Sequence, residues 1–150
     1  MDFLRWLMAV LHFAALGIGL GAIWMRYRAL RSVNEPGALQ RAFAADNLWA
    51  LAAALWIGSG LMRAFGGLEK GTPYYLHNGA FHLKMGLFGL ILLLEIRQMV
   101  TLIRWRIALK KGQTPDLGPS TIMARISLIQ AILVLLMIGA ASAMARGFGL

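Results

Sequence analysis

The chain has 150 residues, of which 59% are hydrophobic and 14% charged, with a net charge of +9 and no cysteine. A small soluble domain cannot bury that much apolar surface, so the composition indicates an integral membrane protein. The lack of cysteine excludes disulfides, thiolate metal sites and cysteine nucleophiles. The sequence also shows no paired carboxylates, no nucleophile with its base and no phosphate loop, so hydrolase and kinase functions are not expected.

Four apolar segments are long enough to cross the roughly 30 Å of bilayer hydrocarbon, which takes about 20 helical residues. They cover approximately residues 3–25, 44–64, 80–103 and 122–145. The connections between them are short and contain glycine and proline, so successive helices should pack antiparallel. The sequence therefore predicts an all-α fold, an integral membrane four-helix up-and-down bundle that forms a single transmembrane domain over residues 1–150.

Basic residues are distributed unevenly between the two ends of this bundle. Nine belong to one end: the first connection holds Arg26, Arg28, Arg31 and Arg41, and the third holds Arg104, Arg106, Lys110, Lys111 and Arg125, while Arg97 lies inside the third helix and is not counted. Five belong to the other end: Arg5, Arg63, Lys70, Lys84 and Arg146. The positive-inside bias places the first and third connections in the cytoplasm and both termini on the extracytoplasmic side. Because topology explains the basic residues, a nucleic-acid partner is not expected.

This topology predicts opposite results for reporter fusions in the two kinds of connection. A reporter fused at Lys111 should lie in the cytoplasm, and one fused at Gly71 should lie outside it. Activity of a periplasmic reporter compared with a cytoplasmic one at each position measures this. An extracytoplasmic signal at Lys111 would show that the assignment of sides must be inverted.

Two of the three histidines lie within predicted helices. His12 stands in "AVLHFAALGIGLG" and His82 in "GAFHLKMGLFGLI", and each has a glycine seven residues further on, Gly19 or Gly89. A spacing of seven returns to nearly the same helix face two turns deeper. An ionisable side chain in a bilayer is a functional candidate, and a histidine above a notch suits a flat macrocycle. We therefore expect both histidines, as metal ligands of haem b, to face one shared cavity floored by the two glycines.

Basic side chains near the outer helix ends would surround such a cavity. Arg63, Lys84 and Arg146 are placed to hold haem propionates or an anionic substrate by charge-assisted hydrogen bonds. Each of them alone is equally well explained by snorkelling to lipid headgroups. The third histidine, His77, falls in a predicted connection, where we expect it to be solvated.

The glycines have an alternative explanation in helix packing. Small residues four apart, such as Gly17 and Gly21, let membrane helices approach closely, and this pair predicts a homodimer. Gly19 and Gly89, taken singly, fit the same explanation.

Three further polar residues lie in the inner halves or near the middle of the predicted helices. Asp46 is expected to cap the second helix. Glu95 lies deeper in the third helix, where Arg125 or Arg28 is a plausible partner and a proton path is one interpretation. Gln130, midway along the fourth helix, has no assigned role.

A family resemblance accompanies these features. The motifs "LHFAALGIGLG", "ADNLWALAAALWIGSGLMRAF", "KGTPYYLHNGAFHLKMGLF" and "RWRIAL" resemble those of small four-helix bacterial membrane proteins of unknown function. The resemblance covers nearly the whole chain and implies the bacterial inner membrane, but no activity. More distantly, the histidine of the first helix and the His-x-Lys of the third resemble the haem-b-binding protoporphyrinogen IX oxidase group, which includes copper-resistance membrane proteins. That resemblance implies His12 as an axial ligand, with His82 and Lys84 as the second motif.

Three functions remain open at this stage. The first is a haem b protein that transfers electrons or oxidises a porphyrin- or quinol-like substrate. The second is a copper or other metal-handling protein that uses His12, His82 and methionines such as Met8 or Met85, because imidazole and thioether together suit copper. The third is a non-catalytic subunit that binds lipid or packs against a partner.

Overall fold

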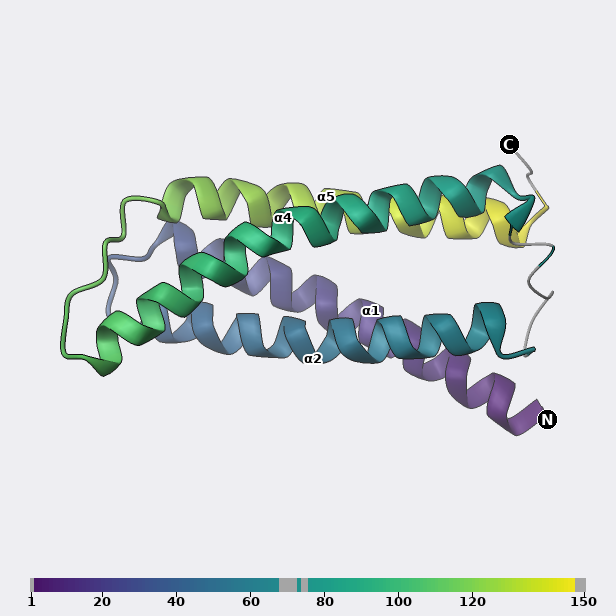
Figure 1. The fold of residues 1–150 in the computed structure, drawn as a ribbon, viewed down its shortest axis with the longest axis horizontal. Helices are drawn as coiled ribbons and strands as arrows, with labels where there is room; N and C mark the ends of the chain where they lie inside the picture. The colour runs from purple at the N-terminus through teal and green to yellow at the C-terminus, as the bar shows by residue number, and fades with distance from the viewer. Residues whose placement is uncertain (1, 68–72, 74–75, 148–150) are drawn as a thin grey trace.

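The structure, a computed structural model, describes residues 2–67, 73 and 76–147. It contains four long helices, α1 (Asp2–Arg31), α2 (Ala38–Phe65), α4 (Gly79–Lys110) and α5 (Ser120–Ala145). Each is long and apolar enough to cross a membrane. Successive helices run in opposite directions, and the start of α1 and the end of α5 lie at the same end of the molecule (Figure 1). The predicted all-α membrane bundle is confirmed.

Each helix contains its predicted segment and extends beyond it, most clearly at the end of the bundle with the basic connections. α1 continues to Arg31 and α4 to Lys110, although the apolar runs stop near residues 25 and 103. Hydropathy marks only the part that can lie in hydrocarbon, whereas the following arginine, leucine, alanine and lysine residues are strong helix formers. At the start of α4, the side chain of Asn78 accepts a hydrogen bond from the Phe81 amide at 3.1 Å and caps the helix.

Extensive packing joins α1 to α2, α1 to α5, and α4 to α5. Small residues permit the closest of these approaches. Gly19 in α1 is buried against the indole of Trp49 in α2, and a Cβ built at this glycine would lie 3.0 Å from Trp49 Cζ3. This contact brings α1 and α2 together along the middle of the bundle.

Buried apolar residues form two core clusters, one toward each end of the bundle. Ile23, Ile91 and Met137 belong to the cluster on the side of the termini, and Leu30 and Leu102 to the one near the basic connections. Along α1, the residue between them is Arg26, which is completely buried. Polar groups therefore separate the two parts of the core.

Candidate functional site

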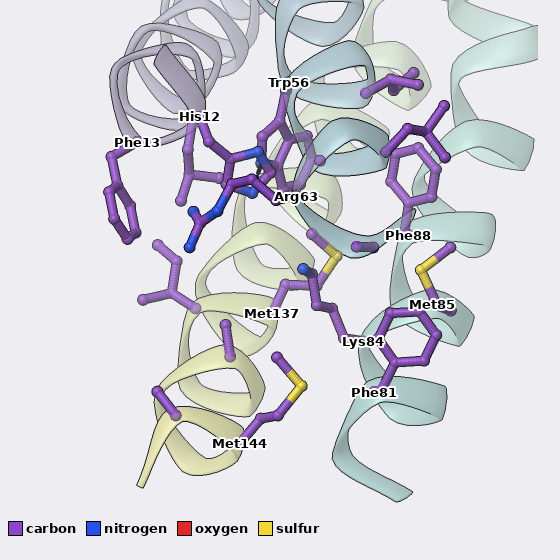
Figure 2. Close-up of a pocket in the computed structure, with 18 of the residues that line it drawn as sticks. His12, Phe13, Trp56, Arg63, Phe81, Lys84, Met85, Phe88, Met137 and Met144 are labelled. Carbon is purple, nitrogen blue, oxygen red and sulfur yellow. Dashed lines mark hydrogen bonds between the residues drawn. The ribbon is translucent and has the colours of Figure 1, made fainter. Parts of the chain in front are cut away.

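A cavity of about 640 Å³ lies between the four helices at the end of the bundle with the termini (Figure 2). Its walls are largely apolar, with Leu16 from α1, Trp56 from α2, Phe88 from α4 and Met137 from α5 among the lining residues. Sites for small organic ligands typically have about 300–1,000 Å³ and such apolar walls. We call this the four-helix cavity.

Three basic side chains from three different helices line the four-helix cavity: His12 from α1, Arg63 from α2 and Lys84 from α4. Lys84 extends from α4 toward the middle of the cavity, while His12 and Arg63 approach from the other side (Figure 2). The guanidinium of Arg63 lies 5.6 Å from the centre of the Phe13 ring, a cation–π arrangement. In the part of the chain that the structure describes, no acceptor is hydrogen-bonded or ion-paired to the Lys84 ammonium.

Both ring nitrogens of His12 are engaged. The indole Nε1 of Trp56 donates a hydrogen bond to His12 Nε2 at 3.0 Å, and His12 Nδ1 lies 3.0 Å from the Ser59 hydroxyl. An indole N–H can only donate, so Nε2 must carry the lone pair and Nδ1 the proton. The Ser59 hydroxyl accepts from that Nδ1–H and donates to the Leu55 carbonyl at 2.7 Å. The histidine is thus neutral, in a defined tautomer, and held against α2.

A glycine that the sequence interpretation did not single out makes room for this ring. A Cβ at Gly60 would lie 3.1 Å from His12 Cε1, so a larger residue there would press on the imidazole. The spacing of seven residues does place His12 and Gly19 on one face of α1, as predicted, but that face packs against α2. The indole of Trp49 occupies the space beside Gly19, so that space is not open to a haem ring.

The prediction that His12 and His82 share a cavity is wrong. His82 is exposed, its Nε2 is hydrogen-bonded to the Leu76 carbonyl at 2.9 Å, and it does not line the four-helix cavity. His82 and Lys84 are two residues apart and therefore lie on nearly opposite faces of α4, and it is Lys84 that points into the cavity (Figure 2). Among the described residues, no three histidine, aspartate or glutamate side chains are grouped to hold a metal ion.

The other predicted site residues also lie outside the four-helix cavity. Gly89 has open space around it and does not line the cavity, so it does not form the predicted floor of that cavity. Arg146 follows the end of α5 and is exposed. His77 is exposed, as expected, with its Nδ1 hydrogen-bonded to the Pro73 carbonyl at 2.8 Å. Of the seven residues assigned to cofactor binding, the cavity brings together His12, Arg63 and Lys84.

A second polar site, which sequence reasoning missed, joins all four helices. The guanidinium of Arg26 in α1 donates to both carboxylate oxygens of Glu95 in α4 at 2.7 Å, to Asp46 in α2 at 3.0 Å and to the Gln130 amide oxygen in α5 at 2.9 Å. Arg106 in α4 also donates to Asp46, at 3.0 Å. We call these five residues the Arg26 cluster. Two arginines and two carboxylates give it no net charge.

The Arg26 cluster corrects three expectations. Arg26 lies in α1 rather than in the first connection, and it is the partner of Glu95 in place of Arg125 or Arg28. Asp46 lies two turns inside α2, so it pairs with arginines and does not cap the helix. The sequence did contain an indication of this cluster. Asp46, Glu95 and Gln130 lie at a similar depth in three of the helices, and buried polar groups at one depth indicate a buried basic partner on the fourth helix.

The four membrane-length helices, together with an intramembrane cavity and a buried ionic cluster, define a polytopic α-helical membrane protein with an internal polar site. Residues 4–149 match the model of a family described as "Predicted membrane protein (DUF2214)", and the chain belongs to this family. This confirms the resemblance to small membrane proteins of unknown function; the more distant resemblance to haem proteins gains no support from it. Neither a curated protein nor a solved structure matches the chain.

Proposed function

We propose that this protein binds a lipophilic carboxylate within the membrane, and that haem b, whose propionates are such carboxylates, is the ligand to test first. The observation that carries the proposal is Lys84, a basic side chain that lines an apolar cavity without an acceptor among the described residues. A charge in hydrocarbon costs several kcal/mol unless it is paired. A bound anionic group would supply the missing partner.

The arrangement of charge and apolar surface indicates the class of ligand. Lys84 and Arg63 come from opposite sides of the cavity, and Leu16, Phe88 and Met137 provide apolar walls. Such a site favours a molecule with an apolar body and an acidic group that accepts charge-assisted hydrogen bonds. It disfavours metal cations, because the two fixed positive charges would repel them.

His12 supports haem b as the particular ligand. Its Nδ1–H is held by Ser59, as the second nitrogen of a metal-ligating histidine is commonly held by an acceptor. Its Nε2 accepts a hydrogen bond from Trp56, and this hydrogen bond would have to break before Nε2 could bind the iron of haem. Arg63 and Lys84 would hold the propionates. Haem, when bound, would supply one-electron chemistry, from which electron transfer or oxidation of a porphyrin- or quinol-like substrate follows.

Absorption spectra of protein purified after haem-sufficient expression test the haem proposal. We expect a Soret band in the wild type that is lost in His12→Ala and reduced in Lys84→Met, while Trp56→Phe, which frees Nε2, keeps it. Lys110→Met is the matched control because that lysine is exposed at the opposite end of α4. A wild type with no Soret band would reject haem, and a stoichiometric metal without haem would favour the copper function.

Binding of a dibrominated fatty acid tests the broader proposal, including the lipid-binding alternative. Trp56 lines the cavity, so bromine in the cavity should quench its fluorescence, with Trp56→Phe identifying that contribution. Lys84→Met should weaken binding roughly tenfold or more, since a hydrogen bond to a charged group is worth about 1.5–3 kcal/mol. Equal affinities of Lys84→Met, Lys110→Met and wild type would contradict a carboxylate site at Lys84.

A further inference from the structure

A second lipid-facing feature lies on α4, away from the four-helix cavity. An open groove on this helix contains Arg97 and Arg104, with Leu93, Ile96 and Val100 among its apolar lining residues. It shares no lining residue with the four-helix cavity. Any role of this groove is therefore independent of the function proposed above.

The two arginines are arranged as a pair. They are seven residues apart, so they lie on nearly the same face of α4, about 10 Å apart along the axis. Both are exposed, and neither forms an ion pair with a carboxylate in the described part of the chain. Glu95, two residues from Arg97 in the chain, is bound to Arg26 instead.

The depth of Arg97 makes this pair unlike the basic residues of the connections. Arg97 is thirteen residues before the end of α4 at Lys110, which is about 20 Å along the helix. It is only two residues from Glu95 of the buried Arg26 cluster. An exposed arginine at this depth faces the bilayer, where an unpaired charge is costly and where long basic side chains reach toward the nearest phosphates.

The order of residues along the groove matches the order of groups in a phospholipid. Arg104 lies nearest the end of α4, Arg97 follows one heptad deeper, and Ile96 and Leu93 continue toward the middle of the helix. Ile96 and Leu93 are 54% and 66% exposed, so they present an apolar surface to lipid. A free phosphate would use the arginines alone, whereas an acyl chain would also cover these residues.

We propose that the Arg97–Arg104 groove binds an anionic phospholipid, with the phosphate between the two guanidinium groups and an acyl chain along Ile96 and Leu93. Basic residues near a membrane surface each contribute about 1 kcal/mol to attraction for anionic lipid, or roughly fivefold in affinity. With both arginines, the affinity for the anionic lipid should then be roughly 30-fold higher than in a variant that lacks both.

Native mass spectrometry of the full chain in detergent tests this site, with phosphatidylglycerol and phosphatidylcholine of identical acyl chains as probes. Wild type should bind phosphatidylglycerol more tightly, and the double variant Arg97→Gln with Arg104→Gln should lose roughly 30-fold of that affinity. The matched control is Arg28→Gln with Arg125→Gln, which removes two exposed arginines from the same end of the bundle that do not line the groove. Detergent has no anionic membrane surface, so only arginines that contact the bound lipid should contribute, and the control should bind like wild type. Elution volume and helical circular dichroism establish that both variants are folded.

Three results would overturn the proposal. An equal loss in the control would show a general effect of charge, and equal binding of both lipids by wild type would show no preference for an anionic headgroup. Displacement of phosphatidylglycerol by millimolar inorganic phosphate would show an anion site without a lipid component. Because the groove is separate from the four-helix cavity, none of these results bears on the Soret band or on fatty-acid binding.

Discussion

Replacing Arg26 with methionine should destabilise this protein by about 3–5 kcal/mol, the range observed when one partner of a buried ion pair is removed. Arg26 is fully buried and binds Asp46, Glu95 and Gln130, one residue from each of the other helices. The variant leaves the Glu95 carboxylate without its bidentate partner. Methionine retains much of the apolar stem of arginine, so the loss of stability reflects the missing charge and its hydrogen bonds rather than a cavity left by a smaller side chain.

Unfolding of the detergent-solubilised protein, followed by the loss of helical circular dichroism, measures this effect. Arg28→Met is the control, because Arg28 is exposed two residues away on the same helix. The double variant Arg26→Met with Glu95→Gln should be less destabilised than Arg26→Met alone, since neutralising Glu95 removes the unpaired charge. If Arg26→Met and Arg28→Met were equally stable, the cluster would not hold the helices together.

Replacing Gly19 with leucine should destabilise the protein by about 1–3 kcal/mol, the usual cost of overpacking a filled site. A Cβ there already lies 3.0 Å from Trp49 Cζ3 and 3.5 Å from the Ala52 Cβ, so the rest of a leucine has no space between α1 and α2. The same substitution at Gly89 should be close to neutral, because nothing lies within 4 Å of a Cβ at that position.

The two glycine variants separate a packing role from a role in a cofactor slot. The interpretation from sequence treats Gly19 and Gly89 alike, as the floor of one haem cavity, and from it leucine at either position would be expected to expel haem. The structure predicts lower unfolding stability for Gly19→Leu alone, and an unchanged Soret band or fatty-acid affinity for Gly89→Leu. A Gly89→Leu variant that folds normally but loses its ligand would show that α4 presents this glycine to the ligand after all.

The Arg26 cluster shows where prediction from sequence reaches its limit. Asp46, Glu95 and Gln130 were each recognised as polar residues in or near apolar segments, but their common partner was assigned to a connection. Hydropathy ended the first helix near residue 25, whereas α1 runs to Arg31 and carries Arg26 into the core. A hydropathy window responds to the exposed Arg28 and Arg31 in the same way as to a buried Arg26.

The two histidines show the same limit at the candidate site. Their matching distance to a glycine predicted matching environments, yet His12 is held by Trp56 and Ser59 while His82 contacts the Leu76 carbonyl. The spacing determines only which residues share a face of their own helix. What that face meets depends on how the helices are rotated against one another.

The sequence by itself determined the membrane location and the four antiparallel helices, because hydrocarbon thickness and backbone hydrogen bonding leave long apolar segments few alternatives. It also identified His12 through the cost of an ionisable group in an apolar segment, and Arg63 and Lys84 as basic residues near the outer helix ends. Only the tertiary structure decided that Lys84 rather than His82 enters the four-helix cavity and that Arg26 joins four helices. Those outcomes depend on the rotation and tilt of each helix, which are set by contacts between residues far apart in the chain, such as Gly19 with Trp49.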